Sequence, residues 1–256
     1  MSKSPSHLTS ILLALLVTLL WSTSFVIIKI GLAEIPPLTF AGLRYTIAFI
    51  CLLPFAFTES NYTVIKNLRK KDWLKLVFLG FLFYAFTQGT QFIGLSLLPA
   101  VTVSLWLNFT PLIVAVMAIF LINEYPTQLQ WLGVVLFIVG IFTYFFPVAL
   151  SENQGLGLIV MTIGVLANSA SAVLGRNINR EGRISPIVVT IISMGIGSIL
   201  LFVIGIVLQG LPAISFRIYY TFSGLLSLTQ HLLLRYGILL FEHCLRWSQA
   251  LLMEQC

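Results

Sequence analysis

The chain has 256 residues, of which 59% are hydrophobic and only 9% are charged. This balance excludes an ordinary soluble domain, because a soluble domain must cover its surface with charged and polar side chains. The net charge of +6 does not indicate a nucleic-acid partner, since the basic residues gather in short loops between apolar stretches, where they set membrane orientation. The lipid bilayer is the first partner that we expect.

Seven apolar stretches follow one another, each about the length of a bilayer crossing, about 20 residues. They predict an all-α polytopic membrane protein. We expect membrane-spanning helices at residues 9–31, 37–57, 74–97, 100–122, 128–147, 156–177 and 186–208, with a less regular eighth at 218–241. The connections between neighbouring stretches are short, so consecutive helices should be antiparallel.

Basic residues occur in alternate loops. Residues 66–71 follow the second stretch and residues 176–183 follow the sixth, and both segments are rich in Lys and Arg. The loops after the first, third and fifth stretches contain neither residue. The positive-inside rule then places both basic loops and the N-terminus in the cytoplasm, in a multi-pass protein of the cell membrane.

The chain carries a weak internal repeat. Residues 21–29 and 168–176 share small polar residues, then apolar residues, then a cation, and each segment precedes a loop that ends in proline. The offset equals five spans, so the second copy would be inverted relative to the first. Inverted repeats are a common plan of secondary transporters, in which the substrate site lies at the repeat interface near the bilayer midplane.

Short motifs in the first half resemble the EamA domain of the drug/metabolite transporter superfamily. They are the sequences at residues 20–25, 37–45, 94–96, 110–112, 123–127 and 131–133. The resemblance extends from residue 8 to about residue 215 and is densest in the first half. It implies a ten-span fold of two inverted five-span repeats, and carriage of small solutes, often export of metabolites or amino acids.

We expect a first repeat at residues 8–147, a partial second repeat at 155–216 and a tail at 217–256. The tail gains polar residues where the family would place further spans. Back-translation in a shifted frame gives two strings that resemble the family's eighth span and ninth-span entry, so we interpret the tail as out of frame. A divergent short homologue is the alternative, and it would need a homodimer or a different function.

The third span carries a polar stripe. Its members are Tyr84, Thr87, Gln88 and Gln91. They follow the spacing of one α-helical face. Polar side chains in hydrocarbon are costly unless they face protein or water, so the stripe should face the interior of the helix bundle. It would either line a substrate path or provide hydrogen bonds for helix packing.

Two further spans carry a similar pattern. In the fourth, Ser104 and Asn108 lie one turn apart and Pro111 follows. Because proline removes a backbone hydrogen bond, Pro111 should kink the helix beside Asn108. In the sixth, Asn168 and Ser171 repeat the pairing of small polar residues. These positions are candidates for the lining of a substrate cavity.

The first two spans contribute the remaining candidates. Trp21 and Ser22 lie inside the first span, and Trp21 is too deep for an interfacial belt, so it would form either an aromatic cavity wall or ordinary packing. Arg44 in the second span would either contact an anionic group or extend to the interface. For Lys29, near the end of the first span, extension of the side chain to the interface is the favoured interpretation.

All eight acidic residues fall outside the seven apolar stretches. Cation sites and proton relays in membranes usually use an embedded carboxylate, so neutral, zwitterionic or anionic solutes fit better than cationic ones. The spans hold no nucleophile–histidine–acid set, no phosphate-binding loop and no cysteine pair. We therefore expect no enzyme activity, cofactor or metal. The alternative to a transporter of small metabolites is a truncated membrane remnant that transports nothing.

Overall fold

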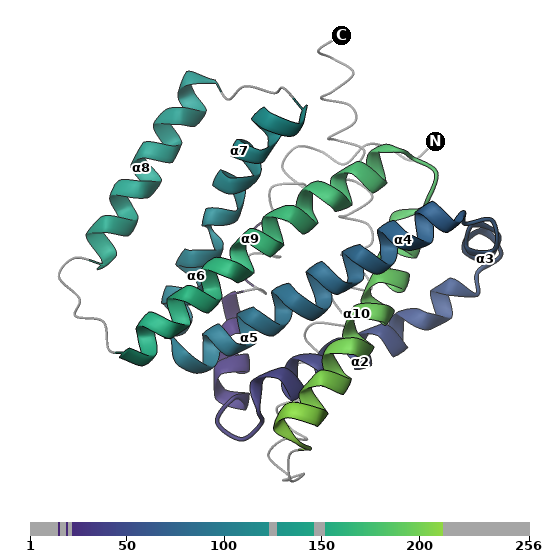
Figure 1. The fold of residues 1–256 in the computed structure, drawn as a ribbon, viewed down its shortest axis with the longest axis horizontal. Helices are drawn as coiled ribbons and strands as arrows, with labels where there is room; N and C mark the ends of the chain where they lie inside the picture. Colours follow the sequence, from purple (N-terminus) through teal and green to yellow (C-terminus); the bar gives the residue numbers. More distant parts are fainter. Residues whose placement is uncertain (1–14, 16–18, 20–21, 123–126, 146–151, 212–256) are drawn as a thin grey trace. The chain divides into compact units, whose positions relative to one another are not determined.

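The computed structural model describes residues 15, 19, 22–122, 127–145 and 152–211, and every regular element in them is helical (Figure 1). Five of these helices are long and apolar enough to cross a membrane: Pro37–Ala56, Lys70–Leu97, Ala100–Met117, Gln154–Arg180 and Pro186–Gln209. Two shorter apolar helices are Ser22–Gly31 and Trp131–Tyr144. The prediction of an all-α polytopic membrane protein is confirmed.

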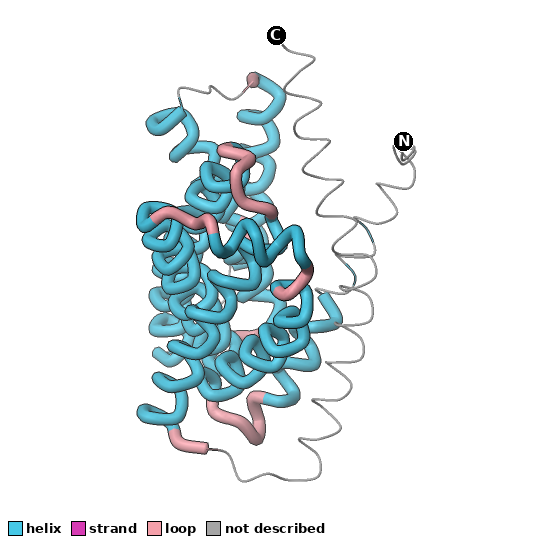
Figure 2. The backbone as a smooth tube through the Cα atoms, turned by 90° about the vertical axis from the view of Figure 1, so that its right-hand side faces the viewer, coloured by secondary structure: helices cyan, strands magenta, loops and turns pink. Residues whose placement is uncertain are grey.

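The chain forms two compact units, of which Ile35–Pro212 is the larger. Its helices are α2 (Pro37–Ala56), α3 (Glu59–Lys66), α4 (Lys70–Leu79), η1 (Gly80–Thr87), α5 (Gln88–Leu97), α6 (Ala100–Leu107), α7 (Phe109–Ile122), α8 (Gln128–Phe145), α9 (Glu152–Arg180) and α10 (Pro186–Gln209). Figure 2 shows short connecting loops and no strand among the described residues. The other unit contains Met1–Glu34, where the helix at Ser22–Gly31 lies.

The helices begin and end close to the predicted spans, with two differences. The third helix begins at Lys70, four residues before the predicted boundary, and α9 extends beyond the predicted 156–177 at both ends. A fall in hydropathy marks where the bilayer ends, whereas polar residues outside it can continue the helix. The predicted eighth span and the tail at 217–256 lie outside the described residues.

Helices α2 and α10 are antiparallel neighbours that approach closely at glycines. A Cβ atom added to Gly42 would collide with the backbone of Phe202, and one added to Gly205 would lie 2.6 Å from the Thr39 nitrogen. Small residues let helix backbones approach in a membrane, where apolar burial alone does not draw helices together. The α2–α10 pair is therefore held by backbone-level contact.

The middle of the third span is a π-helix, η1, rather than the regular α-helix that we predicted. The Thr87 hydroxyl donates a 2.8 Å hydrogen bond to the carbonyl of Leu82, five residues earlier, which matches the π-helical repeat. Gly80 and Gly197 bring η1 against α10, because a Cβ on Gly197 would overlap the Gly80 carbonyl oxygen. Such π-helical segments occur often at functional sites.

Helix α9 lies between two groups of helices (Figure 1). It packs on α5 and η1, where a Cβ on Gly164 would collide with Thr90, and it also packs on α6 and α7. The packing of α9 on α6 and α7 positions the candidate site.

Candidate functional site

The fourth span is broken at Asn108, between α6 and α7. Pro111 has no N–H to donate to the carbonyl of Leu107, and its ring crowds that carbonyl. The Asn108 side chain is exposed, and its Nδ2 donates a 2.9 Å hydrogen bond to the Ser104 carbonyl. A break therefore lies at Asn108, where we predicted a kink, inside an apolar stretch of helix.

The broken helix faces polar side chains of α9. Asn168 Nδ2 donates a 3.0 Å hydrogen bond to Thr110 Oγ1, and Ser169 Oγ lies 3.4 Å from the Thr110 carbonyl oxygen. One and a half turns away, Trp106 Nε1 donates to Thr162 Oγ1 at 3.0 Å. The structure therefore brings Asn168 and the break together, although they are 58 or more residues apart in the sequence.

Aromatic rings lie beside the same break. The Trp106 and Phe109 rings have centroids 5.3 Å apart in an edge-to-face arrangement, and Phe109 contacts Phe137 of α8 at 5.1 Å. Ser171 is buried, and its hydroxyl donates to the Asn168 carbonyl at 2.7 Å. The surroundings of the break thus combine uncharged hydrogen-bonding groups with aromatic rings.

The polar stripe of the third span faces protein. Tyr84, Thr87 and Gln88 are buried, and Gln91 is half-buried. The Tyr84 ring meets the Tyr45 ring of α2 edge-on at 5.7 Å. Among the described residues, the Gln88 Oε1 atom is buried without a hydrogen-bond partner. A buried acceptor that lacks a donor is costly, so this atom is suited to meet a donor that arrives with a solute or water.

The remaining candidates lie in different places. Arg44 is half-buried, and its guanidinium lies 5.4 Å from the centroid of the Tyr45 ring, next to the Tyr45–Tyr84 pair. Ser22 is exposed on the helix of the smaller unit, and Trp21 lies outside the described residues. The structure thus groups Arg44 with Tyr84 of η1 and Asn168 with the α6–α7 break, and Ser171 lies about one turn along α9 from Asn168.

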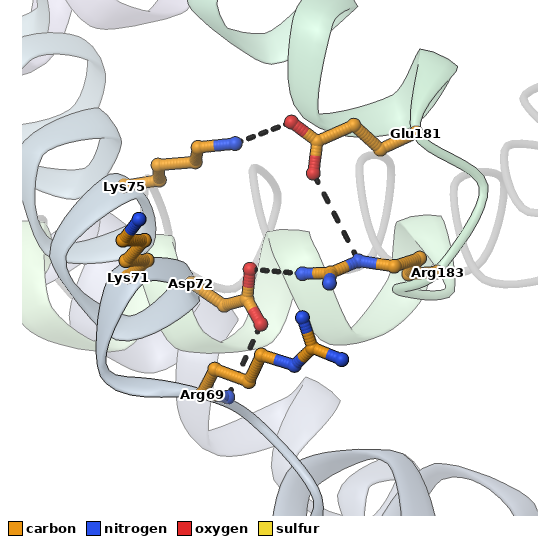
Figure 3. Close-up of a pocket in the computed structure, with 6 residues that line it drawn as sticks. All are labelled: Arg69, Lys71, Asp72, Lys75, Glu181 and Arg183. Carbon is orange, nitrogen blue, oxygen red and sulfur yellow. Dashed lines mark hydrogen bonds and ion pairs between the residues drawn. The ribbon is translucent and has the colours of Figure 1, made fainter.

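A charged cluster, formed by Asp72, Lys75, Glu181 and Arg183, lies at the end of the unit that carries both basic loops (Figure 3). Arg183 pairs with Asp72, and Lys75 pairs with Glu181. A weaker contact of 3.9 Å joins Arg183 Nε to Glu181. The cluster therefore connects the start of α4 with the loop between α9 and α10.

Asp72 lies at the boundary between the first basic loop and the third helix. We placed it outside the spans, but the third helix begins two residues before it, and its carboxyl side chain is only 6% exposed. Its Oδ2 also accepts a 3.1 Å hydrogen bond from the Arg69 backbone N–H. This carboxylate is thus buried at a helix end and already paired with a cation.

A pocket of about 390 Å³ opens at the cluster, where Arg69 and Lys71 add to its lining (Figure 3). Buried apolar side chains from α4, α9, α10 and the α9–α10 loop form one packed group, the apolar plug. Its members are Leu76, Leu79, Ile178, Ile184, Val188, Val189 and Ile192. The charged cluster and the apolar plug both join α4 to the region where α9 ends and α10 begins.

Sequence reasoning missed several of these residues. Thr110, Trp106 and Thr162 contact the site but carry no unusual spacing. The charged cluster did leave a signal: Asp72 and Lys75 lie one helical turn apart, and Glu181 and Arg183 carry the complementary charges in the other basic loop. No group of three metal-ligating side chains occurs within the described residues.

Comparison with known proteins gives a consistent result. Residues 8–146 match the model of the EamA-like transporter family. The chain is 30% identical over 223 residues to the "Uncharacterized transporter YvbV" of Bacillus subtilis (strain 168), across 84% of this chain and 68% of that protein. Two relatives named "Probable amino-acid metabolite efflux pump" match at 32% (Salmonella typhimurium, 50% of this chain and 40% of the relative) and 31% (Escherichia coli, 62% and 48%). The chain thus spans less than half the length of these two relatives.

Proposed function

Because the chain belongs to the EamA-like transporter family, we propose that it is a secondary carrier that exports a small, amino acid-like metabolite by alternating access. The solute is neutral, zwitterionic or anionic. The carrier works in the cell membrane with its N-terminus and both basic loops in the cytoplasm. Its substrate lies between the repeats that we predict at residues 8–147 and 155–216.

The observation that carries this proposal is the broken helix opposite α9. Interrupted helices near the midplane are the usual substrate sites of secondary carriers, because a break exposes backbone polar groups where lipid offers none. Here Asn108 lies at the break, and Asn168 on α9 donates a hydrogen bond to Thr110, two residues further along the chain. Irregular backbone and a facing polar helix therefore meet in one place.

The chemistry of these groups supports an uncharged or zwitterionic solute. Asn108, Thr110 and Asn168 offer amide and hydroxyl groups, which bind both ends of an amino acid without fixing a net charge. Asp72, the one carboxylate buried in a described membrane helix, is paired with Arg183 at the helix end. Two relatives are named as amino-acid metabolite efflux pumps, which supports the same substrate class.

Other predicted residues would complete the path. Gln88, the first residue of α5, offers a buried acceptor, and Tyr84 of η1 and Gln91 of α5 extend that stripe. Arg44, next to the Tyr45–Tyr84 pair, would favour the carboxylate of a zwitterion or an anion.

The test is counterflow in proteoliposomes that contain the purified full chain. Vesicles loaded with one unlabelled amino acid at a time should take up the same labelled amino acid faster than empty vesicles do. Asn168→Ala should reduce this uptake at least about tenfold, since it removes a polar contact from the site. Asn177→Ala, an exposed asparagine of the same helix, is the matched control and should leave uptake unchanged. Uptake equal to that of protein-free vesicles for every solute would instead favour the non-transporting alternative.

A further inference from the structure

We infer that the charged cluster is a reversible gate that closes the basic-loop end of the solute path. This inference rests on the proposed function, because a gate requires a path. The cluster joins α4, within the predicted first repeat, to the α9–α10 loop, within the predicted second repeat. Movement of the repeats against each other at this end must therefore separate its ion pairs.

The charges of the cluster are arranged reciprocally. Helix α4 presents an anion and a cation one turn apart, and the α9–α10 loop presents the complementary pair two residues apart (Figure 3). Like charges would meet if either element shifted by about one turn, so the cluster also fixes the register of closure. The interaction is thus specific to one closed arrangement.

The pairs are weak enough to open. The side chains of Lys75, Glu181 and Arg183 are each about 40% exposed, at 39%, 42% and 43%. Water solvates such charges readily once they separate, so an exposed pair contributes little net stability. These ion pairs form in one specific geometry and contribute little net stability, so they are suited to repeated opening and closing.

Asp72 would keep one hydrogen bond when its ion pair with Arg183 separates. Its Oδ2 accepts the backbone N–H of Arg69, at the start of its own helix, and only its Oδ1 meets Arg183. Opening would therefore not leave the carboxylate without a donor, which is the usual cost of breaking a buried ion pair. The mobile partner is Arg183, on the loop.

Two further features seal the same end. The apolar plug lies beneath the cluster and contains residues of α4, α9 and α10, so it must also separate when the path opens. Beside it, Ser185 Oγ donates a 3.0 Å hydrogen bond to Asn61 Oδ1 and ties the start of α10 to α3. The charged cluster thus forms the rim of a gate whose body excludes water.

The test measures access to a cysteine inside the proposed path. Ser171→Cys is the reporter, because Ser171 is buried and lies ten residues from Glu181, about 15 Å along a helix. The native cysteines are replaced by serine in the full chain. A charged, membrane-impermeant thiol reagent is then applied to the basic-loop side of oriented membrane vesicles, and the labelling rate is measured.

Removing one charge of the gate should speed labelling. We expect Arg183→Gln to increase the rate about fivefold, the size of a modest population shift between closed and open states. Arg183→Lys keeps the cation and should label close to the parent rate. Lys71→Gln removes a charge from the same pocket but, among the described residues, Lys71 forms no ion pair, so this control should also match the parent.

The gate would be contradicted if all variants were labelled at the same rate, or if none were labelled. It would also be contradicted if Lys71→Gln increased the labelling rate as much as Arg183→Gln does. A third contradiction would be a parent labelling rate that does not rise when added salt screens the exposed ion pairs. Gel filtration of each variant shows whether it is folded. The labelling experiment requires no solute, so it is independent of the transport assay. If labelling changes as expected but no solute shows counterflow, the proposed function is contradicted and the gate is not. If counterflow occurs but labelling is the same in all variants, the gate is contradicted and the proposed function is not.

Discussion

The two ends of the larger unit are held together by different kinds of contact. At one end α2 and α10 meet at glycines, and uncharged hydrogen bonds join them: the Leu38 N–H donates to Gln209 Oε1 at 2.8 Å, and Thr39 Oγ1 donates to the Gly210 carbonyl at 3.1 Å. At the other end the long side chains of the charged cluster connect α4 to the α9–α10 loop.

This difference separates a fixed joint from a movable one. Backbone contacts at glycines tolerate almost no displacement, because neighbouring backbones already touch. Long, exposed charged side chains can part and meet again at small net cost. We therefore regard the α2–α10 pair as the axis that stays in place and the charged end as the part that opens.

The largest effect should come from filling the α2–α10 contact. Gly42→Leu places a side chain where even one Cβ collides with the Phe202 backbone, so we expect a loss of at least about 3 kcal/mol or failure to fold. Gly133→Leu on α8 is the control, because no atom lies within 4 Å of its added Cβ. Monodispersity and thermal unfolding in detergent distinguish the two variants. Equal behaviour would show that the axis is not close-packed.

A smaller loss should follow from removing the buried carboxylate. Asp72→Ala leaves the Arg69 N–H and Arg183 without their acceptor, and should cost about 1–3 kcal/mol. Asp72→Asn keeps an oxygen for the Arg69 N–H and should retain part of that stability. Thermal unfolding of both variants measures the difference. If Asn were as damaging as Ala, the backbone hydrogen bond would contribute nothing.

The next largest loss of stability should come from removing the uncharged hydrogen bond between α2 and α10 at the opposite end. Gln209→Ala removes the acceptor of the Leu38 N–H in the first turn of α2, and should cost about 1 kcal/mol, as for a lost helix cap. This loss should not change with ionic strength, because neither group is charged. A strong salt dependence of the difference between wild type and variant would contradict the assignment.

The smallest effect on stability should come from the exposed ion pair. Lys75→Gln should change the free energy of unfolding by less than about 1 kcal/mol, because both partners are well exposed. Added salt should reduce even this difference. Chemical unfolding at low and high salt checks it. A loss as large as that of Asp72→Ala would mean that the pair holds the fold and does not serve a reversible contact.

The sequence predicted the spans well because a bilayer imposes one length and one composition on each helix. It also located the break at Asn108, since Pro111 acts on its own helix. It did not find the η1 π-helix, which depends on how Gly80 and Gly197 let two helices meet. The π-helical repeat leaves no distinctive residue pattern in the chain.

The site residues also divide into those that the sequence indicated and those that only the fold brings together. Asn108 and Asn168 were recognised because a polar side chain in an apolar span requires an explanation. Asp72 was missed because it lies just outside the hydropathy boundary, although the helix and its burial begin there. Its partner Arg183 is 111 residues away, a pairing that only the fold creates.

The most direct test of the account compares distances across the two ends by pulsed electron spin resonance. Spin labels at Lys71→Cys and Arg180→Cys flank the charged cluster, and labels at Leu43→Cys and Leu208→Cys report on the α2–α10 pair, in a chain whose native cysteines are replaced. We predict two distances across the charged end, with the longer one enriched by Arg183→Gln, and one unchanged narrow distance for α2–α10. A single distance at the charged end that Arg183→Gln leaves unaltered, or equal broadening at both ends, would contradict the account.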